Sequence, residues 1–441
     1  MLWSTQPAFE ENALDYTTYH KQPNAGQTLW YALDVTEAAQ AWYRGTSPNY
    51  GLALKAYNPG NNEIMVFASS DVTNEEAGAR PTLMIYYRNH TGLEDYWTYH
   101  SHSAGNSGNG YVNDFTGNLV FQTRGISIGD AVMPFSLYLT YNSSDANTPA
   151  TTHSTQRNRF GYGFRLNVVQ RVDATGISDY PYSYTDGDGT KHYFGTDMKD
   201  EDGLGLTLTV EPDNKYKIVN KEETSKMNFD EQGYLRKITD NNGNWISFNY
   251  GPENGDHILR DINTNTGAWI YLGYYGAGNN EKLKTIQDSA GRVTTFSYEQ
   301  EHFLTNITYP DGTTTRFDYD GQGMLQSVKN NDNSGIYYVM SGDRKVLDVH
   351  ERESNWATAR RLYKADYYLN ETVFTDAINR RTTYQFNSVG LTTGVFDDKG
   401  NVSRADYSDE RESQNKLTAS AGSAGAAVNY IKNGDFSRNG K

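Results

Sequence analysis

The pattern Gly125-Ile-Ser127-Ile-Gly129 has residue types that could do chemistry, because a serine held between glycines can be a hydrolase nucleophile. That use requires a helix directly after the turn that carries the serine. Here Met133-Pro134-Phe135 leads into an alternating, strand-like run instead. We therefore predict no catalytic residue and keep a serine hydrolase that uses Ser127 as a remote alternative.

Two further patterns have the residue types of metal ligands. Asp186-Gly-Asp188-Gly-Thr190 begins like a calcium-binding loop, but Lys191 stands where the loop needs glycine and Asp197 where it needs glutamate. We predict a hairpin turn there, with weak calcium binding left open. His100 and His102 would face the same side of a strand and could bind a metal, yet no cysteine or carboxylate cluster completes the set nearby. We favour a solvated loop, and the sequence predicts no metal site and no cofactor.

Trp30, Trp42 and Tyr43 are aromatic residues that could stack on a sugar. The alternative, which we favour, is that they fill the core of a β-sandwich. Paired acids for glycoside hydrolysis can always be chosen from 54 Asp and Glu residues. No pair is set apart by its surroundings, so that chemistry has no support.

The composition limits the class of protein. A chain of 441 residues is too long for one ordinary core, and its 35 tyrosines and 41 glycines favour β structure over helix bundles. The net charge of −15 argues against a nucleic-acid partner, which needs a basic face. The lack of cysteine excludes disulfides and thiolate metal sites.

The start of the chain shows no targeting segment. Residues 1–7 lack the basic and apolar stretches of a signal peptide. No run of about 18 apolar residues exists that could cross a membrane. We expect a protein that is not inserted in a membrane.

The second half of the chain repeats one phrase at a fixed spacing. In five matched pairs the residue numbers differ by 21: Leu283/Leu304, Ile286/Ile307, Gly291/Gly312, Phe296/Phe317 and Tyr298/Tyr319. Weaker copies begin at Leu235, Leu325 and Phe374. Self-similarity at a period of roughly 20 to 50 residues is typical of a repeat array.

Each copy has the pattern of a β-hairpin. Alternating apolar residues, such as Phe296 and Tyr298, fit a strand with one buried face. Asp288-x-x-Gly291 and Pro310-Asp311-Gly312 supply turn residues, because aspartate bonds to nearby backbone and glycine accepts positive φ. A lone hairpin is marginal in water, so the array is stable only if neighbours pair edge to edge into one twisted sheet.

We expect a set of repeat residues to pack this sheet or to permit its turns. They are Gly243, Tyr250, Asp288, Gly291, Phe296, Tyr298, Asp311, Gly312, Phe317 and Tyr319.

The repeated phrase, Gly-x-Leu-x-x-Ile-x-Asp-x-x-Gly-Asn/Arg-x-x-x-Phe-x-Tyr, resembles the tyrosine-aspartate (YD) repeat of the wall-associated RHS (rearrangement hotspot) proteins. The resemblance covers residues 227–407. It implies strips of hairpins that spiral into a hollow shell around the chain's own C-terminal toxin. Residues 111–226 look like the opening strips of such a shell.

The two ends of the chain resemble other modules. Leu33-Asp34-Val35-Thr36 and Arg80-Pro81-x-Leu83-x-Ile85-x-Tyr87 are similar to the end of the DNRLRE domain, a jelly-roll module of bacterial surface proteins. A short helix should bring Val35 and Trp42 onto one face. The last residues, 429–441, are similar to the opening strand of a carbohydrate-binding jelly roll.

The sequence therefore predicts an all-β protein: a partial β-sandwich followed by hairpin repeats in a long curved sheet or partial shell. The expected regions are a DNRLRE-like half-sandwich (1–88), a Gly/Ser-rich linker (89–110), RHS-type opening strips (111–226), YD hairpin repeats (227–410), a flexible linker (411–428) and the start of a carbohydrate-binding-like domain (429–441).

We expect the chain to be an internal piece of a secreted, cell-wall-associated RHS protein with no catalytic residues of its own. Its expected partner is a C-terminal toxin that lies outside this sequence, for use in competition between cells. The alternative is an extracellular module that binds cell-wall polysaccharide or serves in adhesion, without a toxin.

Overall fold

The computed structural model describes residues 91–128, 132–146 and 159–431, together with isolated positions between 35 and 52. Short gaps interrupt the last range at 254–255, 277–281, 300–301, 356, 369, 388, 401, 408–414 and 421–428. The chain divides into two compact units, Met1–Tyr87 and Arg88–Lys441. No helix in these described residues is long and apolar enough to cross a membrane.

Few positions of the first unit are described. Ala38, Ala39 and Trp42 are helical, and the Ala39 N–H donates to the Val35 carbonyl at 2.9 Å, as the expected short helix requires. The half-sandwich strands predicted for residues 1–88 lie outside the described residues. The DNRLRE-like module therefore stays a prediction.

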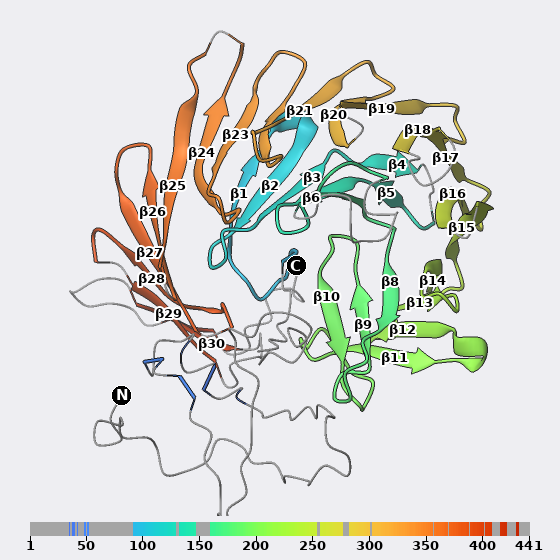
Figure 1. Cartoon of the computed structure of the whole chain (residues 1–441), viewed down its shortest axis with the longest axis horizontal. Helices are drawn as coiled ribbons and strands as arrows, with labels where there is room; N and C mark the ends of the chain where they lie inside the picture. Colours follow the sequence, from blue (N-terminus) through green and yellow to red (C-terminus); the bar gives the residue numbers. More distant parts are fainter. Residues whose placement is uncertain are drawn as a thin grey trace, which may run out of the picture. The chain divides into compact units, whose positions relative to one another are not determined.

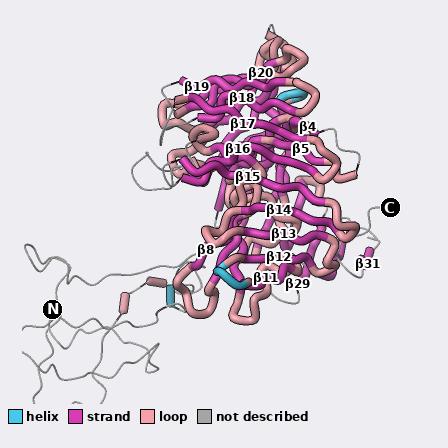
Figure 2. Tube along the Cα trace, turned by 90° about the vertical axis from the view of Figure 1, so that its right-hand side faces the viewer, coloured by secondary structure: helices cyan, strands magenta, loops and turns pink. Residues whose placement is uncertain are grey.

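The second unit is built on one antiparallel sheet of 21 strands, in which each strand pairs with the next along the chain. Figure 1 shows the strands following one another around a curve, and Figure 2 shows β11 to β20 stacked in order. The all-β hairpin array expected from the sequence is confirmed. A 3₁₀ turn, η4, spans Pro212–Asn214.

The strands of this long sheet are β11 (Leu206–Val210), β12 (Tyr216–Asn220), β13 (Ser225–Phe229), β14 (Leu235–Asp240), β15 (Trp245–Glu253), β16 (Asp256–Thr264), β17 (Trp269–Tyr275), β18 (Lys282–Asp288), β19 (Val293–Glu299), β20 (Phe303–Thr308), β21 (Thr314–Tyr319), β22 (Leu325–Lys329), β23 (Gly335–Met340), β24 (Val346–Arg352), β25 (Arg360–Tyr368), β26 (Glu371–Asp376), β27 (Arg381–Phe386), β28 (Thr392–Asp397), β29 (Val402–Tyr407), β30 (Asn415–Ser420) and β31 (Asn429–Ile431).

Each strand of the repeat buries one face. Along β19, Thr294 and Phe296 are buried while Val293, Thr295 and Ser297 are exposed. This period of two follows from the strand geometry, which points successive side chains to opposite faces. One side of the sheet is therefore core and the other is surface.

A β-bulge recurs at the end of many hairpins. The strand register shifts between Asn249 and Tyr250, between Ser297 and Tyr298, and between Asp318 and Tyr319. At each shift the partner strand has one extra residue, such as Thr305 opposite β19. Bulges bend a strand and increase its right-handed twist, so the periodic bulges account for the curve of the sheet.

The shorter strands of the second unit form smaller sheets. A five-stranded sheet has the order β1-β2-β3-β6-β7, a three-stranded sheet has the order β10-β9-β8, and β4 pairs with β5. Their bounds are β1 (Tyr99–Ser103), β2 (Gly108–Asn113), β3 (Leu119–Thr123), β4 (Ile126–Ile128), β5 (Phe135–Leu137), β6 (Leu139–Asn142), β7 (Phe164–Leu166), β8 (Arg171–Ala174), β9 (Tyr182–Thr185) and β10 (Lys191–Phe194), with a 3₁₀ turn η3 (Gly105–Ser107).

These smaller sheets lie inside the curve of the long sheet (Figure 1), and we call β1 to β10 the inner strands. One hydrophobic core joins both layers, with Tyr141 and Leu166 of the inner strands beside Phe296 and Leu325 of the long sheet. A cavity of about 10 Å³ lies between them, which is about the volume needed by one water molecule. A larger cavity of about 430 Å³ lies between Gly105 and the turns at Thr313 and Asn331. The inner strands therefore pack directly on the concave face of the sheet.

The predicted linker at 89–110 is wrong where β1 and β2 cover it. Its glycines permit close approach between strands and between layers: a Cβ added to Gly110 would lie 2.3 Å from His102 Nε2 and 2.5 Å from Tyr338 Oη. A Cβ on Gly108 would lie 2.1 Å from the Gln122 carbonyl oxygen. Small residues are needed here for packing, whereas composition alone had indicated flexibility.

The predicted flexible linker at 411–428 is also wrong at residues 415–420, which form β30. The physical reason is the edge of the sheet: β29 ends the repeats with a row of unpaired backbone groups, and such an edge templates a further strand. β30 pairs with β29 and in turn with β31.

Candidate functional site

Hydrogen bonds join the inner layer to the long sheet where the two meet on the concave face. At several bulges a backbone N–H near the start of the bulged strand donates to an acceptor on an inner strand or on a segment beside one. These contacts are Leu235 N to Gln170 O (3.2 Å), Leu283 N to Arg159 O (2.8 Å), Leu325 N to Tyr141 Oη (3.1 Å) and Val346 N to Gly117 O (3.0 Å). Buried backbone donors need partners, so these inner segments complete the hydrogen bonding that the bulges interrupt.

Aromatic contacts join the two layers at the same places. Phe164 of β7 meets Phe317 edge to face, with ring centroids 5.1 Å apart. Phe135 of β5 packs in the same way on Phe248, at 6.2 Å. Such pairs stabilise a core beyond the area that they bury.

The tyrosine that gives the repeat its name has a second role in some hairpins. Tyr319 Oη donates to the Leu304 carbonyl at 2.7 Å, and Tyr274 Oη donates to the Leu259 carbonyl at 2.6 Å. Each hydroxyl reaches back across its own hairpin and ties the two strands together at their open end.

Tyr250 and Tyr298 occupy the same repeat position without this bond. Their hydroxyl oxygens are buried and have no hydrogen-bond partner among the described residues. Burial raises the pKa of both phenols, so both stay neutral. These four hairpins thus keep the aromatic ring at the repeat position, and only two of them keep its hydrogen bond to the neighbouring strand.

The predicted turn residues lie at the hairpin tips. Gly243, Gly291 and Gly312 have φ of 83°, 81° and 78°, a region that favours glycine. Asp288 Oδ1 accepts the Ala290 and Arg292 N–H groups at 3.0 and 2.9 Å.

Asp311 is likewise at a tip, where it accepts the Thr313 N–H at 3.0 Å and pairs with Arg124 at 2.9 Å. Hydrogen bonds from Thr313 and Arg124 lower the pKa of Asp311 to about 2. Arg124 follows β3, so this tip also contacts the inner layer.

The histidine pair lies in β1, with His102 buried and His100 partly buried, so its prediction as a solvated loop is wrong. His102 is 9% exposed and its Nε2 shares a hydrogen bond of 2.7 Å with Tyr338 Oη. His100 stacks on Phe374 with ring centroids 3.6 Å apart and bonds to Asp114. Both side chains pack against the long sheet, which the local sequence does not reveal.

Ser127 lies in β4, and its hydroxyl shares a hydrogen bond of 3.3 Å with the hydroxyl of Ser136 on β5. In the described part of the chain the serine thus contacts a second hydroxyl in a strand pair, without the turn and helix that a nucleophile needs. Of the expected sugar-stacking residues, Trp42 is helical and partly exposed, while Trp30 and Tyr43 lie outside the described residues.

The pattern at Asp186 forms the turn between β9 and β10. Asp186 Oδ1 accepts the N–H groups of Asp188, Gly189 and Thr190 at 3.1, 3.0 and 3.0 Å. Asp188 Oδ2 accepts the Leu93 N–H at 2.9 Å. The turn therefore holds the segment that leads into β1.

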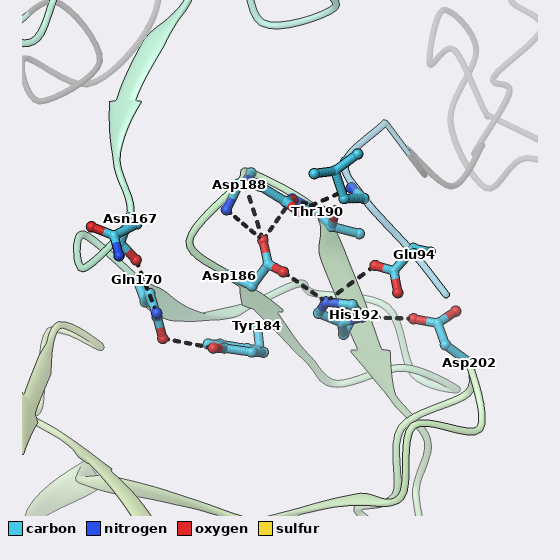
Figure 3. Close-up of polar contacts among 12 residues, drawn as sticks. Glu94, Asn167, Gln170, Tyr184, Asp186, Asp188, Thr190, His192 and Asp202 are labelled. Carbon is cyan, nitrogen blue, oxygen red and sulfur yellow. Dashed lines mark hydrogen bonds and ion pairs between the residues drawn. The ribbon is translucent and has the colours of Figure 1, made fainter. Parts of the chain in front are cut away.

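Next to this turn, His192 of β10 is surrounded by carboxylates (Figure 3). Its Nδ1 lies 2.9 Å from Asp202 Oδ2, while its Nε2 lies 3.5 Å from Asp186 Oδ2 and 3.7 Å from Glu94 Oε1. Glu94, His192 and Asp202 are all buried. We call Glu94, Asp186, His192 and Asp202 the histidine cluster.

The pKa values of two groups in the histidine cluster, Glu94 and His192, are raised. Burial raises the pKa of Glu94 to about 9. Burial lowers the pKa of His192, but its interactions with the carboxylates of Asp186 and Asp202 outweigh it and raise that pKa to about 11. Sequence reasoning missed this cluster, because only Asp186 and His192 are near each other in the chain.

Comparison with known proteins gives the repeat block a family. Residues 214–393 match the Teneurin YD-shell family. Over 411 residues, 90% of this chain, the sequence is 26% identical to the tRNA(Glu)-specific nuclease WapA of Bacillus subtilis subsp. natto (strain BEST195) and to the tRNA nuclease WapA of Bacillus subtilis (strain 168). The match covers 16% of each relative, so this chain spans a small part of their length.

Solved structures give a more distant likeness. Crystal structures of TcdB2-TccC3-TEV and of TcdB2-TccC3 without its hypervariable C-terminal region match 73% of this chain and 22% of theirs. Their sequence identities are 9% and 10%, with TM-scores of 0.29 and 0.30.

Proposed function

This chain is an RHS/YD-repeat protein similar to the WapA proteins, and from that premise we propose that it is a non-catalytic wall section of a toxin-enclosing shell. The observation that carries the proposal is the single sheet of consecutive hairpins with one buried, concave face. Such a sheet can surround a volume without supplying chemistry of its own.

The inner strands give this section a particular place in the proposed shell. They fill its concave face with side chains, so this part of the wall is a plugged portion of the shell and the cargo lies elsewhere. The hydrogen bonds from Leu283 and Leu325 to inner segments support a permanent plug, because each satisfies a buried backbone donor.

We assign the nuclease activity that names the relatives to parts of those proteins that this chain does not match. On this proposal the parent protein is secreted and wall-associated, and its cargo is a C-terminal toxin. The purified chain should therefore leave a pool of tRNA intact. Cleavage by the purified chain would contradict a non-catalytic wall.

A segment exchange tests the wall role. The matching stretch of Bacillus subtilis WapA is replaced by this chain, and protection of the nuclease from added protease is measured. We expect protection to persist, and expect it to fall when the exchanged segment carries Phe296→Ala, which opens the core. A nuclease that is equally protease-sensitive with either segment would contradict enclosure by this wall.

One surface observation favours a second function, binding of a glycan. Tyr271 is 52% exposed and its ring lies 4.4 Å from that of Trp269. The cross-strand pairs Asp261 with Tyr271 and Asn263 with Trp269 place polar side chains on the same exposed face. Aromatic rings beside fixed polar groups are a common composition of ligand sites.

The glycan proposal is tested by pull-down on purified peptidoglycan. Saturable binding that is lost in Tyr271→Ala, and retained in the control Tyr368→Ala, would support it. Tyr368 is 59% exposed on β25, a distant strand of the same sheet, which makes it a matched exposed tyrosine. Equal binding by both variants would sink the Tyr271 site.

A further inference from the structure

The histidine cluster has the geometry of a metal site. Glu94 Oε1, Asp186 Oδ2 and His192 Nε2 all lie within 4.8 Å of one another. The distances from His192 Nε2 to the two carboxylate oxygens are 3.5 and 3.7 Å. Ligands at about 2.0–2.1 Å from a tetrahedral Zn²⁺ lie about 3.3–3.4 Å apart, so only a small contraction of these two distances is needed for such a site.

The remaining atoms of these side chains are already held by the protein. His192 Nδ1 is engaged by Asp202, and Asp186 Oδ1 accepts three backbone N–H groups of its own turn. A carboxylate on one imidazole nitrogen orients the other nitrogen toward a metal and fixes the tautomer. Once the proton on His192 Nε2 is released, as metal binding requires, the lone pairs of Asp186 Oδ2 and His192 Nε2 converge on one point.

Glu94 supplies an independent observation. Glu94 is 6% exposed, and its Oε1 points at His192 but has no hydrogen-bond partner among the described residues (Figure 3). A buried carboxyl oxygen without a hydrogen-bond partner is costly. A single N–H at His192 Nε2 cannot satisfy two oxygens at 3.5 and 3.7 Å, since both distances exceed a normal hydrogen bond. A divalent cation can bind both oxygens at once.

The segment that carries Glu94 is fitted closely to the turn at Asp186. A Cβ added to Gly92 would lie 1.7 Å from Thr190 Oγ1, and the Leu93 N–H is bonded to Asp188. Tyr99 Oη donates to the Gly92 carbonyl at 2.9 Å and accepts the Glu94 N–H at 2.8 Å. The ligand from the N-terminal segment is thus pre-positioned rather than loosely attached.

We propose that Glu94, Asp186 and His192 bind a divalent transition-metal ion of the Zn²⁺ class, with Asp202 as the residue that orients the imidazole. The ion joins residues 91–94, which precede β1, to the β9–β10 hairpin. It therefore links the beginning and the end of the sequence that forms the inner strands. It acts as a structural staple at the start of the second unit, next to the boundary at Arg88.

The test uses the full chain, freed of metal by a chelator and titrated with Zn²⁺ in a calorimeter. We expect one ion per chain, and expect Zn²⁺ to raise the thermal unfolding midpoint. Glu94→Gln and His192→Gln, which keep side-chain size, should each weaken Zn²⁺ binding at least tenfold. Asp202→Asn should weaken it about 10- to 100-fold, as loss of an orienting partner does.

The control is Asp173→Asn, a half-exposed carboxylate on β8 that pairs with Arg171, and it should bind Zn²⁺ like the natural chain. Circular dichroism and cooperative unfolding establish that each variant is folded. The proposal is overturned if the natural chain shows no saturable Zn²⁺ binding, or if folded Glu94→Gln and His192→Gln bind as well as it does. Binding of Ca²⁺ in place of Zn²⁺ would overturn the assigned class of metal.

Discussion

The long sheet and the inner strands are built by different rules. In the long sheet many hairpins repeat the same local solution: a turn with Asp and Gly, a bulge, and alternate buried side chains such as Phe296 and Phe317. The inner strands have no repeat, and each contact with the long sheet is specific to its position. Periodicity therefore builds the wall, and individual side chains and backbone groups join the inner layer to it.

The largest expected effect is loss of a ring from the shared core. Phe296 is 1% exposed, so Phe296→Ala should cost about 3–5 kcal/mol of unfolding free energy, through lost burial and a cavity. Thr295→Ala, one residue away on the exposed face, should change it by less than about 0.5 kcal/mol. Urea unfolding of both variants makes the measurement. Similar losses at the two positions would contradict a one-sided sheet.

Acid should weaken the joint between the layers through His102. Burial lowers the pKa of His102 to about 4, whereas an unfolded histidine titrates near 6.5. The unfolded chain therefore binds the proton more readily, and stability falls as the pH drops from about 6.5 toward 4, by up to about 3 kcal/mol.

The variant His102→Gln isolates this contribution, because glutamine can still bond to Tyr338 and does not titrate. The free energy of unfolding, measured between pH 7 and pH 4, should fall less steeply in the variant. An unchanged slope would mean that His102 is not buried under the long sheet.

Two glycines sharpen the comparison between the layers. In the inner layer, Gly110→Ala should cost about 1–3 kcal/mol, because its Cβ meets Tyr338 and His102 in a packed core. In the long sheet, Gly291→Ala should cost about 1–2 kcal/mol, from positive φ alone, since no atom of the described residues lies within 4 Å of its Cβ.

Enlarging both side chains further separates the two causes. Gly110→Val should be much worse than Gly110→Ala, while Gly291→Ser should resemble Gly291→Ala, because only the first site lacks space. Thermal unfolding of the four variants checks this order. Equal tolerance of valine and alanine at position 110 would contradict close packing there.

The smallest expected effect separates two tyrosines at the same repeat position. Tyr319→Phe removes the bond to the Leu304 carbonyl and should cost about 1 kcal/mol. Tyr298→Phe removes a buried hydroxyl that has no partner among the described residues, and should be neutral or slightly stabilising. Urea unfolding of the two variants distinguishes them, and the reverse order would refute the hydrogen-bond assignment.

The sequence predicts the long sheet better than the inner strands, and the reason is physical. The spacing of Phe296, Tyr298, Phe317 and Tyr319 predicts the hairpins, because alternation and turn residues act within one copy. Gly110 and His102 look like part of a linker, because the neighbours that demand them lie in β23, far along the chain. The bulges depend on pairing between strands, which a single copy does not encode.

The histidine cluster was hidden for the same reason. Asp186 and His192 share a hairpin, but Glu94 comes from a segment that precedes β1, and no local pattern marks it. The pattern at Asp186 predicts the turn that the structure contains, but it does not predict that Asp186 Oδ2 faces His192. Local patterns predict local structure, and the cluster depends on contacts between distant segments.

The central claim is that the inner strands pack directly into the concave face of the long sheet. A double-mutant cycle between Phe164 and Phe317 tests it, with each ring changed to leucine singly and together, and unfolding free energies measured in urea. The contact of these rings predicts a coupling energy of about 0.5–1.5 kcal/mol. A coupling energy indistinguishable from zero would show that the rings do not meet and would contradict a filled concave face.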